Sequence, residues 1–488
     1  MSRPRCIALH SPERKLMANK SAIVIGGSMA GLLAARVLTN HFERVTVIER
    51  DELPDAPDMR NGVPQGRHIH ALLARGQELL EEYFPGLSDE LTQAGSPRFT
   101  WCKDTCYYTA AGWMKRFDSG IVTNVITRPD LEWRVRRRIQ ANPKVTFMTG
   151  YDVRKLVANA DNRTVTGVEI EKRGEKNLET LHADLVVDAS GRGSKAPEWL
   201  TALGYDTPPE TQVNAYIGYS TRIYEKPANF NDSWRVLFVV GRPMEGIKRG
   251  AGLFDIGNNQ WMVTLGGMNK DYPPTDEAEF LEYAKTIASS TVYDAIKNAK
   301  PVSPIYGYRI TGSRLRHFEK LARQPEHFIA LGDAVCAFNP LYGQGMTTAA
   351  LGAKALDEML GQWGKQHTDL TGFAAGYQKR LAKVVQNAWV IATGEDLRYD
   401  GTEGDRPGAA ARLVQVYIDA YLRVAQNDEK LTLAFIEVNN LTAPPTSLFA
   451  PHLFARVLVR TLQRAIQRRI NKTPSPYEIG DMIPAVSR

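Results

Sequence analysis

The fold is decided by Ser21-Ala-Ile-Val-Ile25, followed by Gly26-Gly-Ser-Met-Ala-Gly31 and Leu32-Leu-Ala-Ala-Arg-Val-Leu38. The first run is β-branched, the second is rich in glycine, and the third has apolar residues at helical spacing. They predict a buried strand, a tight turn and a helix. A second strand-like run, Arg44-Val-Thr-Val-Ile48, ends in Glu49. We therefore expect a Rossmann-like α/β unit at this end of the chain.

The turn reads G-x-S-x-x-G, with Ser28 where the dinucleotide fingerprint has its middle glycine. Serine is small enough to let backbone N–H groups approach a pyrophosphate. An acidic residue at the end of the second strand accepts hydrogen bonds from the ribose hydroxyls of adenosine. The alternative is a turn whose glycines serve only helix–strand packing. The pattern favours an adenine dinucleotide site formed by Gly26, Ser28, Met29, Ala30, Gly31, Glu49 and Arg50.

A second glycine-rich segment lies about 300 residues downstream and distinguishes FAD from NAD. Phe328-Ile-Ala-Leu-Gly-Asp-Ala334 predicts a strand that ends at Asp333, whose carboxylate can bind a ribityl hydroxyl. Gly343-Gln-Gly345 and Met346 then open a long helical run. The positive end of a helix dipole suits the electron-rich edge of a reduced flavin. An NAD dehydrogenase has no need of this second element, so we expect FAD.

The bulk composition describes a globular protein of two or three units, with 488 residues and a net charge of +7. This charge is modest, and no nucleic-acid-binding module is recognisable. The four cysteines, Cys6, Cys102, Cys106 and Cys336, have neither disulfide nor metal-ligand spacing, so we expect a cytoplasmic protein without a metal. Residues 1–19 predict a disordered leader, or translation that begins at Met17.

Three further segments complete a resemblance to the flavoprotein hydroxylase superfamily, the aromatic hydroxylase and squalene epoxidase type. Met59-Arg-Asn-Gly-Val63 resembles the loop beside the flavin ring, which implies that Arg60, Gly62 and Val63 contact the cofactor. Ile126-Thr-Arg-Pro-Asp-Leu131 resembles the segment whose arginine, here Arg128, reaches the ribityl–phosphate region. Asp184–Ser194 resembles a third segment but departs from its usual Ala-Asp-Gly, which leaves a nicotinamide role open. Val153 completes the expected cofactor set.

A narrower likeness is to the flavin epoxidases of polyether antibiotic pathways, the lasalocid and monensin epoxidase type. It rests on Val63–His70, Val187–Gly193 and Asp333–Met346 and runs from about Ser21 to Gly394. The resemblance implies a monooxygenase that uses a flavin C4a-hydroperoxide to epoxidise or hydroxylate a lipophilic polyene, terpenoid or aromatic compound. NAD(P)H, or reduced flavin from a separate reductase, supplies the electrons. Pro340 borders the oxygen side of the ring, and His68 or His70 tunes a proton or serves only the structure.

We expect a discontinuous FAD-binding domain (20–97, 119–205 and 300–372), a β-sheet substrate domain (98–118 and 206–299) and a C-terminal helical region (373–488). We expect the antiparallel sheet to cover one side of the flavin. Five aromatic residues are candidates for the substrate cavity, although each also suits a plain core position: Trp101, Tyr107, Tyr216, Phe238 and Trp261.

The segment 452–470 predicts a basic amphipathic helix, with Phe454, Leu458, Leu462 and Ile466 near one face and arginines beside them. It either packs on the body with a solvated arginine edge or makes peripheral contact with anionic lipid. The oligomeric state stays open.

Three other functions compete with the monooxygenase. Flavin-dependent halogenases share the fold but carry a W-x-W-x-I-P signature, which this sequence lacks. Prenyl-chain reductases have a turn like Asn339–Gly345 but reduce a double bond without consuming O2. A flavin-binding scaffold that only docks a partner is the third alternative.

Overall fold

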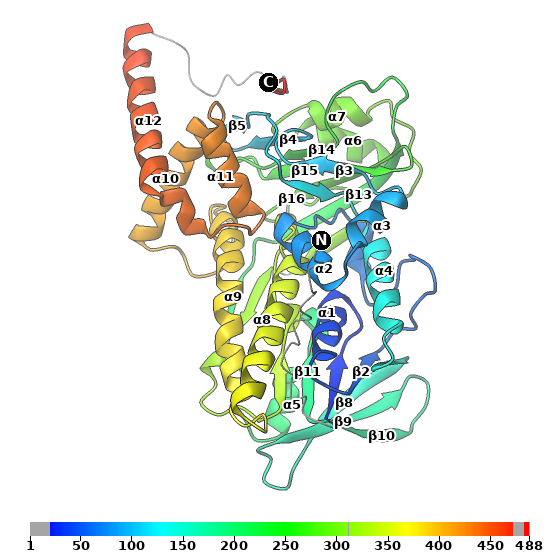
Figure 1. Cartoon of the computed structure of the whole chain (residues 1–488). Coiled ribbons are helices and arrows are strands. Elements are labelled where there is room, and N and C mark those ends of the chain that lie inside the picture. Colours follow the sequence, from blue (N-terminus) through cyan, green and yellow to red (C-terminus); the bar gives the residue numbers. More distant parts are fainter. Residues whose placement is uncertain (1–19, 311, 472–482, 488) are drawn as a thin grey trace, which may run out of the picture.

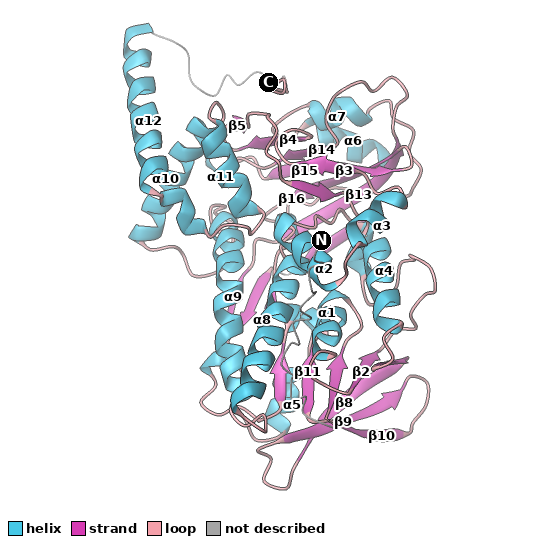
Figure 2. Cartoon of the chain, viewed as in Figure 1, coloured by secondary structure: helices cyan, strands magenta, loops and turns pink. Residues whose placement is uncertain are grey.

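The computed structural model describes residues 20–310, 312–471 and 483–487, and the expected leader therefore lies outside the described residues. Its lower half, as drawn in Figures 1 and 2, is built on a parallel sheet in the order β19-β11-β1-β2-β7. The strands are β1 (Ser21–Ile25), β2 (Arg44–Glu49), β7 (Val145–Thr149), β11 (Leu185–Asp188) and β19 (Phe328–Ala330). The β1–turn–α1–β2 unit is the one that the sequence predicts.

This parallel sheet is buried on both faces, which is why its strands are almost continuously apolar. The helices α1 (Met29–Leu38), α8 (Gly345–Gln366) and α9 (Phe373–Asp396) share one hydrophobic core with it. The same core includes Val165, Val168 and Ile170 of an antiparallel sheet formed by β8 (Tyr151–Ala158), β9 (Val165–Lys172) and β10 (Leu178–His182). The remaining helices of this half are α2 (Ala74–Tyr83), α3 (Leu87–Gln93), α4 (Arg128–Gln140) and α5 (Ala196–Ala202).

The upper half is a mixed sheet in the order β17-β13-β16-β15-β14-β4-β5 (Figure 2). Its strands are β4 (Thr105–Thr109), β5 (Gly112–Trp113), β13 (Ile217–Glu225), β14 (Val236–Val239), β15 (Arg249–Gly257), β16 (Gln260–Gly267) and β17 (Tyr306–Ile310). Neighbours pair antiparallel except β14 with β4. The helices α6 (Glu277–Lys285) and α7 (Thr291–Ile296) pack on the outer face of this sheet.

The sheet differs from the expected substrate domain at one boundary. The predicted range ends at residue 299, yet β17 pairs with β13 through Ile217↔Ile310 to Thr221↔Tyr306. The chain therefore completes this sheet before it returns to the FAD-binding half. Two small sheets connect the halves: β3 (Arg98–Thr100) with β6 (Val122–Asn124), and β12 (Glu210–Val213), β18 (Ser313–Arg316) and β20 (Cys336–Ala337).

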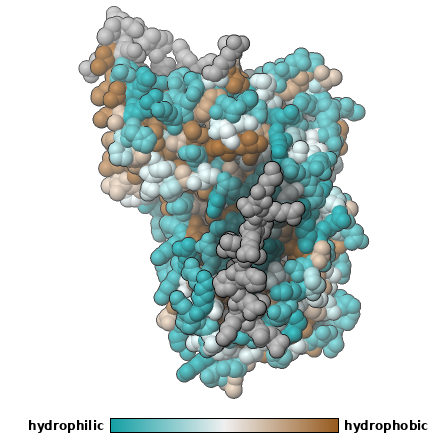
Figure 3. Space-filling view, in the orientation of Figure 1, coloured by the Kyte–Doolittle hydropathy of each residue, from teal (hydrophilic) through white to brown (hydrophobic). Residues whose placement is uncertain are grey.

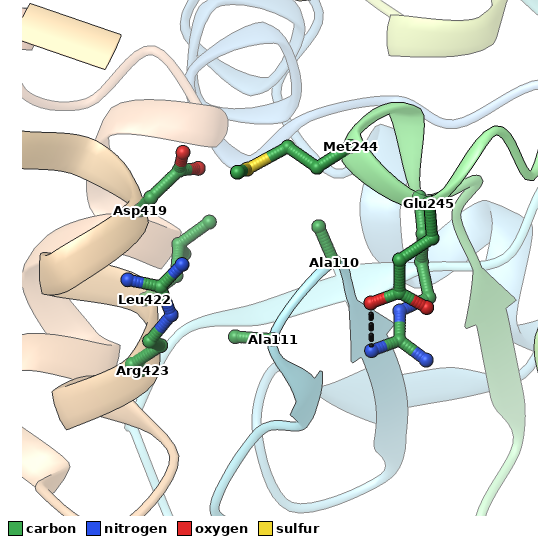
Figure 4. A pocket seen from close by; sticks show the side chains of 8 residues that line it. Ala110, Ala111, Met244, Glu245, Asp419, Leu422 and Arg423 are labelled. Carbon is green, nitrogen blue, oxygen red and sulfur yellow. Dashed lines mark ion pairs between the residues drawn. The ribbon is translucent and has the colours of Figure 1, made fainter. Parts of the chain in front are cut away.

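The C-terminal region is helical, with α10 (Ala409–Ala425), α11 (Glu429–Asn439) and α12 (Pro451–Asn471) beside the mixed sheet (Figure 1). Figure 4 shows where α10 meets the sheet: Asp419 and Leu422 face the Ala110–Ala111 turn and Met244. The gap there is about 20 Å³, and Arg242 closes it through an ion pair of 2.5 Å with Glu245. It holds about one water molecule, so we regard it as a packing gap.

Candidate functional site

A long cavity of about 450 Å³ runs between the two halves of the molecule. One end is formed by the β1–α1 turn and the end of β2, and the other by the Pro64–Ala71 loop, Tyr308 and the Phe338–Met346 turn. Fifteen of the sixteen predicted cofactor residues lie on its wall: Gly26, Ser28, Met29, Ala30, Glu49, Arg50, Arg60, Gly62, Val63, Arg128, Val153, Asp333, Gly343, Gly345 and Met346. Pro340 also lies there.

Gly31 is the predicted cofactor residue that does not lie on the wall. A Cβ atom at this position would sit 1.7 Å from the carbonyl oxygen of Gly26, so glycine lets α1 pack onto its own turn. Gly26 has φ +104°, and a Cβ there would lie 2.6 Å from the carbonyl oxygen of Ala189. Both glycines are therefore required by close backbone contacts, which hold the helix N-terminus against the cavity.

A buried ion-pair network lies directly beside this turn. Arg60 Nε donates to Glu132 Oε1 at 2.8 Å, and Arg60 Nη1 lies 3.0 Å from Asp51 Oδ2 and 3.3 Å from Glu49 Oε1. Arg128 Nη2 donates to Glu132 Oε2 at 3.1 Å and to Ser28 Oγ at 2.7 Å. Glu49 Oε2 also accepts the backbone N–H of Gly27 at 2.7 Å. The two arginines are thus held by carboxylates next to the predicted pyrophosphate position. For Arg60 this corrects the resemblance, which placed it beside the flavin ring, because its contacts with Glu49 and Asp51 hold it at the end of β2.

Glu132 is a residue of this network that the sequence argument missed. Burial by itself would raise the pKa of Glu132, but Arg128 and Arg60 hold the pKa below its ordinary value. Burial also opposes the charge of Arg60, yet Glu132 and Glu49 raise the pKa of that guanidinium. The available signal was the four-residue spacing of Arg128 and Glu132 on α4, which places them on one helix face.

The other end of the cavity is shaped by the turn Asn339–Gly343, which precedes α8. Asn339 Oδ1 accepts the N–H of Leu341 at 3.0 Å and the hydroxyl of Tyr219 at 2.9 Å. Gly343 has φ +64°, and a Cβ there would lie 3.1 Å from Ala71 Cβ. These contacts fix Pro340 on the wall beside the N-terminus of α8.

Asp396, at the end of α9, holds this turn from behind and was also missed. Its Oδ1 accepts from Asn339 Nδ2 at 2.9 Å and from the Tyr342 hydroxyl at 2.8 Å. The side chain is fully buried, and Oδ2 has no hydrogen-bond partner among the described residues. Burial raises the pKa of Asp396 to about 7, although Tyr342 and Asn339 oppose this shift. No sequence pattern links positions 339 and 396.

The two histidines occupy different places. His68, the predicted proton-tuning residue, does not line the cavity: its Nδ1 lies 2.7 Å from Thr221 Oγ1 on β13. His70 is on the wall, and its Nδ1 lies 3.0 Å from the carbonyl oxygen of His68. Burial is the main cause that lowers the pKa of each histidine to about 4, helped by Arg67 at His68 and by Arg128 at His70. Both rings are therefore neutral near pH 7. Since His70 Nδ1 must donate to that carbonyl, its Nε2 is an acceptor.

Three of the five predicted aromatic residues come together on the inner face of the mixed sheet. Phe238 stacks on Trp101 with ring centroids 6.4 Å apart and packs against Tyr107 at 5.6 Å. Ile69 and Ala71 belong both to this cluster and to the cavity wall. This cluster, which we call the aromatic wall, is buried and borders the cavity through Ile69 and Ala71, while Trp101, Tyr107 and Phe238 themselves do not line the cavity. Phe435 of α11 closes it, with its ring 6.1 Å from that of Tyr107.

The other two aromatic residues lie elsewhere. Trp261 is on the outer face of the sheet, where it packs against Phe230 at 4.8 Å and Trp234 at 5.9 Å. Tyr216 adopts φ +48° just before β13, and Lys270 Nζ lies 4.4 Å from its ring. Neither lines the cavity, and the same holds for the other three, so none of the five predicted residues lies on its wall. Side chains on a strand alternate between faces, and the sequence did not show which face is inward.

The cavity also fits a bound dinucleotide by its unsatisfied polar atoms. Arg60 Nη2 and Gln344 Oε1 are buried, belong to residues on the wall, and have no hydrogen-bond partner within the described residues. Buried polar groups are normally paired, so a donor and an acceptor left open here suit a ligand that fills the cavity. Arg192 contributes from the Asp188–Ser194 segment: it lies on the wall and donates to the carbonyl oxygen of Phe338 at 3.0 Å.

Comparisons with known proteins agree with this geometry. The model of the FAD binding domain family matches residues 19–387. The Mycobacterium tuberculosis protein Rv3254 is 32% identical over 428 residues, which cover 85% of this chain and 88% of that protein. Kynurenine 3-monooxygenase of Salinispora tropica is 24% identical over 392 residues, covering 73% of this chain and 75% of the enzyme.

Among solved structures, the flavin-dependent brominase Bmp2 superposes with a TM-score of 0.63 at 14% identity, covering 93% of this chain and all of that one. At this identity the likeness concerns the fold alone. The family match spans the β1–α1 turn, Glu49, Arg60, Arg128 and the Asp333–Met346 segment. The chain therefore belongs to the FAD binding domain family, and it is a flavoprotein with FAD as its cofactor.

Proposed function

We propose that this protein is an FAD-dependent monooxygenase that epoxidises or hydroxylates a lipophilic small molecule. The observation that carries the proposal is the aromatic wall, a buried apolar cluster that borders the cofactor cavity through Ile69 and Ala71. A dry, apolar surface beside the flavin both binds such a substrate and keeps water from the reaction. The similarity to kynurenine 3-monooxygenase supports the same class of activity.

The reaction is balanced with O2 and NAD(P)H as co-substrates. The substrate gains one oxygen atom, the second is released as water, and NAD(P)H with one proton becomes NAD(P)+. FAD, when bound, would supply the redox chemistry that links the oxidation of NAD(P)H to the transfer of oxygen from O2. The electrons come either from NAD(P)H directly or from reduced flavin that a separate reductase supplies. The resemblance to polyether-pathway epoxidases stays a prediction.

The residues of the chain bind, orient and exclude water in this proposal. Arg60 and Arg128 would hold the pyrophosphate, and Glu49 the adenosine ribose, with Asp333 at the ribityl chain. Pro340 and the N-terminus of α8 would border the flavin ring. We assign the proton-tuning role to His70, because its ring lines the cavity while His68 contacts Thr221.

The test measures NAD(P)H oxidation and O2 uptake by the purified yellow protein across polyenes, terpenoids and phenols. We expect at least one substrate to stimulate both equally and to yield a product heavier by one oxygen atom. Bromide is included because halogenases share the fold. A brominated product, a saturated product without O2 uptake, or a flavin that no reductant and substrate turn over would each contradict the proposal.

Adding a flavin reductase to parallel reactions identifies the electron source. Turnover with NAD(P)H alone indicates direct reduction of the bound flavin. Turnover that requires the reductase indicates delivery of reduced flavin.

A further inference from the structure

The C-terminal helices expose an unusual number of apolar side chains. Of the sixteen large apolar side chains that are exposed in the described part of the chain, nine lie between residues 413 and 466. They are Leu413, Val414 and Val416 of α10, Phe449, and Phe454, Leu458, Val459, Leu462 and Ile466 of α12. Figure 3 shows brown side chains along the edge of the molecule where these helices stand. We call this surface the α10–α12 face.

Stacked rings make this face continuous across the two helices. The Tyr417 ring of α10 stacks on Phe449 at 4.7 Å and on Phe454 at 5.3 Å. From Phe454 the exposed residues Leu458, Leu462 and Ile466 follow at four-residue spacing, which places them on one side of α12.

The opposite side of α12 is the one that packs on the protein. Leu453 and Val457 are buried in a cluster with Tyr421 and Val424 of α10. Arg456 pairs with the buried Asp428, and Arg464 donates to the carbonyl oxygen of Arg423. The helix is therefore anchored by two arginines and presents its leucines outward, the reverse of an ordinary surface helix.

Charge indicates which partner covers this face. The sequence 451–471 contains no aspartate or glutamate, and two of its five arginines, Arg456 and Arg464, are used in the contacts with the protein. Arg460, directly after Val459, and Arg412, directly before Leu413, are exposed. A second copy would offer these cations no open carboxylate from either helix, because α12 has no acidic residue and Asp419 of α10 pairs with Arg398, whereas anionic headgroups complement them.

We propose that the α10–α12 face docks on the surface of an anionic lipid bilayer, with its leucines in the headgroup–acyl boundary and exposed arginines at its rim, such as Arg412, at the phosphates. None of the described helices is long and apolar enough to cross a membrane. The α11 helix packs between this face and the aromatic wall, where Phe435 contacts Tyr107. Docking therefore brings a lipid-dissolved substrate to the side of the molecule that holds the substrate wall.

The experiment is co-sedimentation of the FAD-loaded protein with vesicles, followed by the yellow colour of the pellet. We expect binding to phosphatidylcholine vesicles that contain phosphatidylglycerol, and at least about tenfold weaker binding to pure phosphatidylcholine. Leu458→Asp with Leu462→Asp should reduce binding to the anionic vesicles at least about tenfold. The matched control is Leu178→Asp on β10, since Leu178 is 54% exposed and Leu458 53%. It should bind like the parent protein.

The outcomes separate lipid from a protein partner. Absence of vesicle binding, or binding that the double substitution leaves unchanged, would overturn the proposal. So would a dimer in sedimentation equilibrium that the same double substitution dissociates, because the face would then be covered by a second copy. Binding is measured without substrate, so the result does not depend on whether the proposed oxygenation is correct.

Discussion

The two ends of the cofactor cavity differ in their electrostatics. At the β1–α1 turn, Arg60, Arg128, Glu49, Asp51 and Glu132 form a buried network of full charges. At the Asn339–Gly343 turn, burial raises the pKa of Asp396 to about 7, and on the loop between the two ends burial and Arg128 lower the pKa of His70 to about 4. At the first end the carboxylates outnumber the arginines by one, so a pyrophosphate would be held by the open Arg60 Nη2 and the N-terminus of α1. The second is suited to a redox ring and an apolar substrate, where a stray charge would bind water.

The largest effect is expected from breaking the charged end. Arg60→Ala leaves Glu132, Asp51 and Glu49 without their shared cation, and removing one partner of a buried pair costs about 3–5 kcal/mol. We expect the Kd for FAD to rise at least about 100-fold, measured by quenching of flavin fluorescence. Arg60→Lys keeps the positive charge and should lose less FAD affinity than the alanine variant. Arg44→Ala removes an exposed arginine at the start of β2 that does not line the cavity, and it serves as control. An equal loss of FAD affinity in both alanine variants would contradict the role of the network.

The neutral end is tested at Asp396. Its folded pKa of about 7 lies above the ordinary value of 3.8, so ionisation opposes folding. The stability that the protonated carboxyl confers is full below pH 4 and is lost as the pH rises toward 7. Asp396→Asn keeps an acceptor for Asn339 and Tyr342 but cannot ionise. As the pH rises from 4 to 8, the free energy of unfolding of the variant should increase relative to that of the parent by on the order of 1–3 kcal/mol.

The measurement is the free energy of unfolding in urea at several pH values. Asp405→Asn, at an exposed carboxyl in the loop that follows, should show the pH dependence of the parent. If Asp396→Asn instead loses stability relative to the parent as the pH rises, the carboxylate form is the stabilising one and our assignment of the neutral end is wrong.

His70 should give a smaller effect of opposite sign. Its folded pKa of about 4 lies below the ordinary 6.5, so protonation opposes folding and stability is lost as the pH falls from 6.5 toward 4. His70→Gln removes this loss. Between pH 7 and pH 5 the free energy of unfolding in urea should therefore fall by about 1–2 kcal/mol less for the FAD-free variant than for the FAD-free parent. The control is His182→Gln at an exposed histidine, which should leave the pH dependence of the free energy of unfolding as in the parent. If His70→Gln also showed the pH dependence of the parent, the neutral state of the His70 ring would be contradicted.

More of the charged end than of the neutral end could be predicted from the sequence, and the reason is physical. The turn, Glu49 and the helix belong to one local unit, so spacing along the chain places them in space. The contacts of Asp396 with Asn339 and Tyr342 span 57 and 54 residues, and no periodicity joins them. Likewise the choice between His68 and His70, or between Phe238 and Trp261, depends on the direction of a side chain. That direction follows from packing of the sheet, which the pattern of one strand does not encode.

The smallest effect separates cofactor from substrate. Phe238→Leu shortens a side chain of the aromatic wall that contacts Trp101 and Tyr107 but does not line the cofactor cavity. We expect KM for the lipophilic substrate to rise about fivefold, as for a loss of about 1 kcal/mol of apolar contact, while the Kd for FAD stays unchanged. Trp261→Phe, on the outer face of the same sheet, should alter neither constant although it lowers the melting temperature. If Phe238→Leu weakened FAD as much as substrate, the two ends would act as one site, and the division into a charged and a neutral end would not describe how this protein binds its ligands.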